Sequence, residues 1–193
     1  MNLPNKLTLL RVALIPVFVA VLFIEAIPYR FLIAAALYGI ASLTDLMDGR
    51  IARRRGLVTD FGKLLDPLAD KVFVSTALFC IICLTEHPTW RMLLTIATII
   101  IVAREFLVTS LRLLVAGRGV VVPAAQMGKI KTTLQMIAII FILIEMQFGE
   151  WLTEKVYFDH WIGYILLAAA VVTTIISGFQ YVVAYGSYLD PKK

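Results

Sequence analysis

Long apolar stretches, separated by short polar segments, constrain the fold of this chain more than any other feature. Six stretches can be marked, at residues 7–27, 31–46, 72–84, 92–114, 132–146 and 161–185. Backbone groups inside a bilayer must be hydrogen-bonded within the chain, and the period-two alternation of barrel strands is absent. We therefore predict an all-α polytopic membrane protein with six transmembrane helices, whose charged ends continue as helix beyond the lipid.

The composition supports the same class of protein. Hydrophobic residues make up 61% of the 193 residues and charged residues 16%, whereas typical soluble domains have about 45–50% and about 25%. Six spans of about 20 residues fit this length with short connections. Because such a small bundle has one interior, we expect a single membrane domain over residues 1–193.

The positions of lysine and arginine predict how the helices are oriented. With six spans, both termini and the connections after the second and fourth spans share one side, which then holds fifteen of the 18 Lys and Arg residues. Such an excess marks the cytoplasmic side of a membrane protein. We therefore expect cytoplasmic N- and C-termini. The basic residues are accounted for in this way, so we expect no nucleic-acid partner.

Four aspartates lie at the predicted cytoplasmic ends of the second and third helices. Asp45 and Asp48 are three residues apart, and Asp66 and Asp70 are four apart, so the members of each pair share a helix face. A turn between the two helices, with Gly56 as a left-handed cap, makes a hairpin. Such a hairpin can point all four carboxylates at one another.

Converging carboxylates need a counter-charge, because like charges and burial both disfavour their ionisation. Neighbouring Arg and Lys side chains could supply it, as in an ordinary interfacial charge network. Divalent cations are the other solution, and ligands that are all oxygen suit Mg²⁺ or Mn²⁺ rather than zinc. Gly49, Ala52 and Gly62 favour the second interpretation, because they leave space for a ligand beside the aspartates. We therefore predict two divalent cations that clamp phosphate oxygens.

The spacing of these residues resembles a known family signature. Eight residues over 26 positions carry it: Asp45, Asp48, Gly49, Ala52, Arg53, Gly62, Asp66 and Asp70. This pattern resembles the complete signature of the CDP-alcohol phosphatidyltransferase family. The resemblance implies a six-helix membrane bundle with its site at the cytoplasmic side, which agrees with the helix count and orientation predicted above.

What the resemblance implies about chemistry is transfer of a phosphatidyl group from CDP-diacylglycerol to an alcohol, with release of CMP. It implies two divalent cations, Mg²⁺ or Mn²⁺, as cofactors. Their ligands would be Asp45, Asp48, Asp66 and Asp70, and Asp70 would also act as general base on the acceptor hydroxyl. By the same resemblance, the residues that bind the nucleotide would be Thr8, Gly49, Ala52, Arg53 and Gly62.

A second set of basic residues bears on the acceptor alcohol. Arg104 and Arg112 are eight residues apart, which is about two helical turns and places them on roughly the same face. Arginine inside an apolar run is costly and by default functional, although Arg104 could instead pair with Glu105 or an aspartate. The two lysines of the segment GKIKT could complete a phosphate pocket or merely anchor the helix on the inner side. The predicted acceptor-phosphate site comprises Arg104, Arg112, Arg118, Lys129 and Lys131.

Residues 4–11, 103–112 and 128–135 resemble the bacterial phosphatidylglycerophosphate synthases within this family. That resemblance implies glycerol 3-phosphate as the acceptor, a homodimer, and a multi-pass protein of the bacterial cell membrane whose active site faces the cytoplasm. The basic residues alone do not separate glycerol 3-phosphate from inositol phosphate. Serine and phosphatidylglycerol are further acceptors within the family.

Two other classes of protein also fit an acidic membrane helix pair. A membrane prenyltransferase uses Mg²⁺ and a diphosphate, but its two acidic motifs lie far apart in sequence, whereas all four aspartates here fall within residues 45–70. A small cation transporter tends to place its site near the midplane and often contains inverted repeats, which this sequence lacks. Cys80 and Cys83 have no other zinc ligand nearby, and we interpret both as apolar packing residues.

Overall fold

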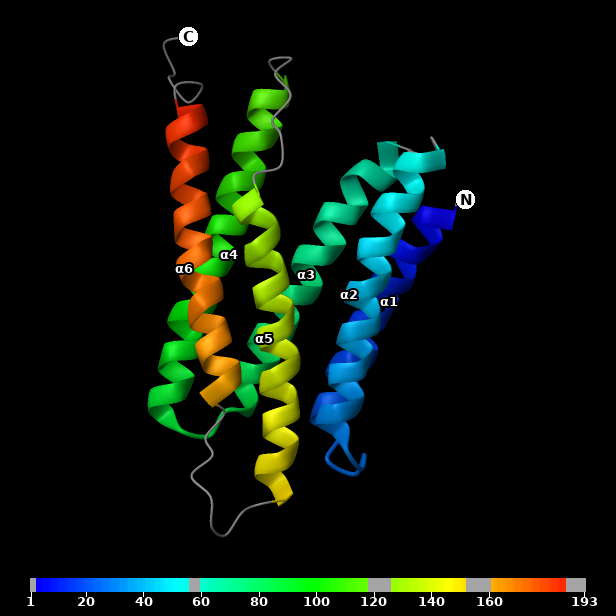
Figure 1. Ribbon diagram of the computed structural model, residues 1–193. Helices are drawn as coiled ribbons and strands as arrows, with labels where there is room; N and C mark the ends of the chain where they lie inside the picture. Colours follow the sequence, from blue (N-terminus) through cyan, green and yellow to red (C-terminus); the bar gives the residue numbers. More distant parts are fainter. Residues whose placement is uncertain (1–2, 56–59, 118–125, 152–160, 187–193) are drawn as a thin grey trace.

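The computed structural model describes residues 3–55, 60–117, 126–151 and 161–186, and its regular elements there are all α-helices (Figure 1). Each predicted apolar stretch falls on a helix of its own, apart from residues 24–27 of the first stretch, which confirms the all-α expectation. The six helices are α1 (Leu3–Phe23), α2 (Arg30–Arg55), α3 (Asp60–Leu84), α4 (Pro88–Gly117), α5 (Gln126–Trp151) and α6 (Trp161–Tyr185).

The helix ends differ from the apolar stretches for local reasons. Helix α1 ends at Phe23, because the chain turns before α2, where Pro28 disfavours helix at the residue before it and Tyr29 has a φ of 57°. Helices α2, α3 and α5 instead extend well into polar sequence, as the prediction of projecting helix ends required.

Three helices in the described residues are long and apolar enough to cross a bilayer. These spans are Pro88–Gly117, Met127–Gly149 and Trp161–Tyr185. The apolar parts of α1 and α2 are shorter, at Thr8–Phe23 and Arg30–Thr44. Length and composition therefore support three of the six predicted transmembrane helices, and the other three remain a prediction.

The helices alternate in direction, and α3 is inclined between two groups of helices (Figure 1). The end of α2 and the start of α3 lie toward the same end of the molecule as the start of α1 and the ends of α4 and α6. Helix α1 packs against α2 and α3, α5 against α2 and α6, and α4 against α3 and α6. Helix α3, which carries Asp66 and Asp70, thus contacts both α1 and the helix α4 that carries Arg104.

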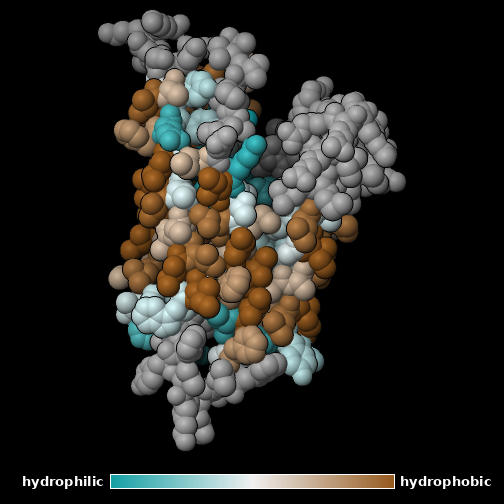
Figure 2. Space-filling model, in the orientation of Figure 1, coloured by the Kyte–Doolittle hydropathy of each residue, from teal (hydrophilic) through white to brown (hydrophobic). Residues whose placement is uncertain are grey.

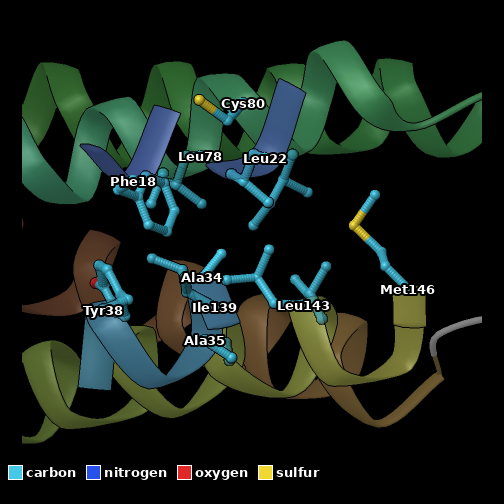
Figure 3. Packing of buried hydrophobic residues seen from close by; sticks show 14 of the residues in the cluster. Phe18, Leu22, Ala34, Ala35, Tyr38, Leu78, Cys80, Ile139, Leu143 and Met146 are labelled. Carbon is cyan, nitrogen blue, oxygen red and sulfur yellow. The ribbon is translucent and has the colours of Figure 1, made fainter. Parts of the chain in front are cut away.

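An aromatic cluster forms the core between α1, α2 and α3 (Figure 3). Phe73 makes edge contacts with Phe18 and Tyr38, with ring centroids 5.4 Å and 5.2 Å apart. Ile139 and Leu143 of α5 are fully buried in the same cluster. Close van der Waals packing of apolar side chains stabilises a core between membrane helices, and these four helices share one interior.

The outer surface has the pattern of a protein in lipid. Figure 2 shows a broad hydrophobic band around the middle of the visible face, with hydrophilic residues toward both ends. Ile99, Ile165 and Phe179 are among the large apolar side chains that are exposed by 60% or more. Large exposed apolar areas mark contact with a membrane or a partner, and helices this apolar indicate a membrane protein.

The two cysteines have different surroundings. Cys80 is buried in the core, as the prediction of a packing role required. Cys83 is exposed, so the same prediction was wrong for it. Residues three apart on a helix differ by about 60° around its axis, and this offset moves Cys83 out of the core.

Candidate functional site

Helices α2 and α3 carry the eight signature residues on their adjoining ends. Asp45 and Asp48 belong to the polar end of α2, and Asp66 and Asp70 to the polar start of α3. The end of α2 and the start of α3 lie toward the same end of the molecule (Figure 1), and the turn that would join them into a hairpin stays a prediction. Gly56, the predicted cap, lies outside the described residues, as do the side chains of the signature residues other than Asp70.

Asp70 is the predicted metal ligand whose side chain is described. It is partly buried, and its charge acts on Tyr38 of α2, on the adjacent Lys71 and on Lys131 of α5. Asp70 therefore lies where α2, α3 and α5 meet. Among the described residues, no group of three or more His, Cys, Asp or Glu could hold a metal; the side chains of the other three predicted ligands lie outside those residues.

Glu105 of α4 joins two of the predicted acceptor residues. Its carboxylate Oε1 forms an ion pair with the Nζ of Lys131 on α5 and lies 3.4 Å from Nη1 of Arg104. Lys131 is only 3% exposed. Because a buried ammonium requires a partner, the pairing with Glu105 accounts for its position. The alternative that Arg104 pairs with Glu105 is also realised.

Lys71 of α3 is a further cation near Glu105, and it was not among the residues of the predicted acceptor-phosphate site. Its Nζ donates a hydrogen bond to Oγ1 of Thr109 and lies 3.4 Å from the backbone carbonyl oxygen of Glu105. Thr109 in turn donates to the same carbonyl at 2.8 Å. These bonds tie α3 to α4 beside Asp70.

Helix α6 holds Arg104 from the other side. Nη2 of Arg104 donates to Oγ of Ser177 at 2.7 Å, and its guanidinium carbon lies 5.7 Å from the centroid of the Tyr181 ring. At Gly178, a Cβ would lie only 3.0 Å from Cγ of Arg104. The absence of a Cβ at Gly178 therefore allows the close approach of the arginine to α6, and the cation–π contact adds further attraction.

The other predicted site residues are less closely connected. Arg112 is exposed but acts electrostatically on Lys71 and Arg104. Lys129 is exposed, and Thr8 is buried in α1. Arg118 lies outside the described residues. Arg104 thus interacts electrostatically with both Arg112 and Lys131, while the binding roles of all the predicted site residues stay predictions.

Charge balance indicates what this cluster can bind. Within the part of the chain whose side chains are described, it contains the cations Lys71, Arg104, Arg112 and Lys131 and the carboxylates Asp70 and Glu105. Cations therefore outnumber anions, and several are removed from water. Such a site favours a ligand with negative charge, and arginine suits the geometry of phosphate.

Sequence reasoning missed Ser177, Gly178 and Tyr181. Their segment, SGFQY, follows a long apolar run and contains no charge. Small residues in an apolar helix do indicate close approach by a neighbour, and this signal was available. It could not identify Arg104 as that neighbour, because the two helices are far apart in sequence.

Comparison with known proteins identifies the family of this chain. A model of the CDP-alcohol phosphatidyltransferase family matches residues 1–176. The chain is 43% identical over 191 residues to the CDP-diacylglycerol--glycerol-3-phosphate 3-phosphatidyltransferase of Bacillus subtilis (strain 168), with 93% of each chain covered. It is 38% identical over 187 residues to the protein of that name in Rickettsia bellii, with 97% of each covered.

A third relative has a related name. The probable phosphatidylglycerophosphate synthase of Mycobacterium tuberculosis (strain ATCC 25618 / H37Rv) is 37% identical over 183 residues, which cover 94% of this chain and 80% of that protein. These matches extend over nearly the whole chain, as does the family model. The chain belongs to the CDP-alcohol phosphatidyltransferase family.

Proposed function

We propose that this protein transfers the phosphatidyl group of CDP-diacylglycerol to sn-glycerol 3-phosphate, giving phosphatidylglycerophosphate and CMP. The observation that carries this proposal is the group of cations from α3, α4 and α5 beside Asp70. A phosphate bound there would keep the acceptor close to the carboxylate that must take its proton. The names of the relatives support the same donor and acceptor.

The aspartates fit divalent cations because all of them offer carboxylate oxygen. Asp45, Asp48, Asp66 and Asp70 would hold two ions, Mg²⁺ or Mn²⁺, which supply electrostatic stabilisation of the diphosphate. Asp70 supports this assignment by its position at the junction of α2, α3 and α5. The small residues Gly49, Ala52 and Gly62, with Thr8 and Arg53, would accommodate the nucleotide.

The reaction itself is a displacement at phosphorus. Asp70 accepts the proton of the acceptor hydroxyl, whose oxygen forms a bond to the phosphatidyl phosphorus. The bond from that phosphorus to the oxygen it shares with CMP breaks, and CMP leaves. Arg53 would stabilise the charge that develops on the leaving phosphate. Arg104 and Lys131 hold the acceptor phosphate, so its hydroxyl is oriented for attack.

Location in the membrane follows from the substrates. The acyl chains of the donor can remain in lipid while its head group reaches the polar ends of α2 and α3. On the neighbouring helices, Figure 2 shows hydrophilic residues toward the same end of the molecule, beyond the hydrophobic band. We place this end in the cytoplasm and the protein in the bacterial cell membrane, as a homodimer. Light scattering of the detergent-solubilised protein tests the dimer.

Release of CMP by the purified protein tests the proposal. CDP-diacylglycerol is incubated with glycerol 3-phosphate, inositol phosphate, serine or phosphatidylglycerol, with Mg²⁺ or Mn²⁺ and with EDTA. We expect CMP only with glycerol 3-phosphate and a divalent ion. Faster release of CMP with inositol phosphate would make inositol phosphate the acceptor and leave the family unchanged. Inorganic diphosphate from a prenyl donor, or ion flux without turnover, would favour the two other classes of protein.

A further inference from the structure

Glu105 occupies an unusual position, because it places negative charge where an anion is expected to bind. One oxygen, Oε1, contacts both Lys131 and Arg104. The side chain of Glu105 is 20% exposed, compared with 4% for that of Lys131. The carboxylate therefore lies at the accessible edge of the pair, in front of a lysine that is almost completely buried.

The two cations depend on Glu105 to different degrees. Arg104 is also held by Ser177 and by the Tyr181 ring, and its Nε is buried without a hydrogen-bond partner in the structure. Arg104 is thus held in place without Glu105, and its Nε–H can donate a hydrogen bond to a ligand. The ion pair with Glu105 is the contact that the structure gives for the ammonium of Lys131.

The backbone of Glu105 is fixed independently of its carboxylate. Its carbonyl oxygen accepts hydrogen bonds from Thr109, at 2.8 Å, and from Lys71, at 3.4 Å. A change of side-chain rotamer can therefore move the carboxylate without disturbing α4. A phosphate that binds Lys131 and Arg104 must displace this carboxylate, since two anions at one pair of cations repel each other.

We propose that Glu105 is an internal competitor of the acceptor phosphate. Its carboxylate neutralises Lys131 while the site is empty and leaves when a phosphate binds. This inference rests on the proposed function and deepens it. A strongly charged phosphate monoester displaces Glu105, whereas a neutral polyol does not, so Glu105 lowers the affinity of the site for phosphorylated acceptors and keeps Lys131 paired when none is bound.

The Glu105→Gln variant tests the inference because it removes the charge and keeps the size of the side chain. Thermal unfolding of the full chain in detergent is measured alone and with glycerol 3-phosphate, inorganic phosphate or glycerol. We expect a lower Tm without anion, because Lys131 loses its partner, and a larger rise of Tm with either phosphate. The KM for glycerol 3-phosphate should fall at least threefold, and glycerol should have no effect.

Glu145→Gln is the matched control. Glu145 accepts hydrogen bonds from the backbone of Ile162 and Gly163 at the start of α6, away from the cation cluster. This variant should change Tm without changing the response to phosphate. Glu105→Asp keeps the charge on a shorter side chain and provides a second variant if Glu105→Gln does not fold, with an expected response between those of the wild type and Glu105→Gln.

An unchanged KM, or a higher KM with a smaller phosphate response in either Glu105 variant, overturns the inference and makes Glu105 a residue that positions Lys131. Failure of the proposed function gives a different result. Suppose the wild type releases no CMP with glycerol 3-phosphate while Glu105→Gln still binds inorganic phosphate more tightly. In that case Glu105 competes with phosphate, and glycerol 3-phosphate is not the acceptor.

Discussion

Asp70 is the residue at which the two halves of the proposed chemistry meet. As general base it must take a proton, and as a metal ligand it must carry charge, so Asp70→Asn removes both functions while keeping the shape of the side chain. General-base catalysis contributes typically about 10²–10⁴-fold. We expect CMP release to fall by at least about 100-fold, with the far-UV circular dichroism of a helical protein retained.

Glu86→Gln provides the control for this substitution. Glu86 is exposed in the connection between α3 and α4, at the opposite end of the molecule from the site. Its loss should leave CMP release within about twofold of the wild type, because surface substitutions away from special features have small effects. Full activity of Asp70→Asn would remove Asp70 from the reaction.

Gly178 determines how closely Arg104 approaches α6. In the Gly178→Ala variant, the new methyl group would lie 3.0 Å from Cγ of Arg104, so the arginine must shift and weaken its bond to Ser177. We expect the KM for glycerol 3-phosphate to rise about tenfold, equivalent to about 1.4 kcal/mol, with kcat little changed. Steady-state kinetics at varied acceptor concentration measure this.

Gly39→Ala is the matched control for Gly178→Ala. A Cβ at Gly39 would meet the Cδ1 atom of Ile140 at 3.7 Å, an ordinary contact. This control shares the cost or gain of replacing glycine by alanine in a helix but does not touch Arg104. If both variants raise KM equally, Gly178 has no specific connection with the acceptor.

At the residue scale, the signature led to the correct family, whereas the polar network around Arg104 could be predicted only in part. Asp66 and Asp70 are related by helical spacing, which is a local property. Glu105 could be suggested as a partner of Arg104 because the two are adjacent. Ser177 could not, because its contact with Arg104 depends on the packing of α4 against α6, and no local rule gives that register.

The α5–α6 pair presents the tightest glycine contact of the described helices. A Cβ at Gly163 would lie 2.4 Å from Cγ1 of Ile142 and 2.9 Å from its backbone nitrogen. Because a backbone atom cannot move aside cheaply, Gly163→Ala should separate the helices and lower the free energy of unfolding by about 1–3 kcal/mol. Chemical or thermal unfolding in detergent measures this loss.

Gly128→Ala is the comparison at the other end of α5, where a Cβ would meet nothing within 4 Å. Alanine has the better helix propensity, so this variant should be as stable as the wild type or more stable by up to about 1 kcal/mol. A Gly163→Ala protein with unchanged stability would mean that α5 and α6 adjust freely to a wider spacing.

At the scale of elements, the apolar stretches predicted which segments form helices better than which side of each helix is buried. Helix α5 is apolar through most of its length, so its residue pattern does not separate a buried side from an exposed side. Lys129 and Lys131 were accordingly assigned to one site. They are two residues apart, about 200° around the helix, and the structure buries Lys131 and exposes Lys129.

At the scale of the whole molecule, the proposed site joins two groups of helices with different proposed roles. Helices α2 and α3 carry the aspartates, and α4 and α5 carry Arg104, Arg112 and Lys131. Asp70 and Lys71 are adjacent on the inclined helix α3, which contacts α1, α4 and α5. A donor bound by the first group and an acceptor bound by the second would therefore meet at α3.

This arrangement works in a cell only if the polar end of α2 and α3 faces the cytoplasm, where glycerol 3-phosphate and released CMP are soluble. The distribution of fifteen of the 18 Lys and Arg residues predicts that orientation, because positive charge is retained on the inner side. A membrane-impermeant maleimide tests it on a background with Cys80 and Cys83 replaced by alanine. The Lys192→Cys variant should react only after permeabilisation, and the His160→Cys variant in intact cells. The reverse labelling pattern would place the aspartates on the outer face, where the proposed reaction has no supply of acceptor.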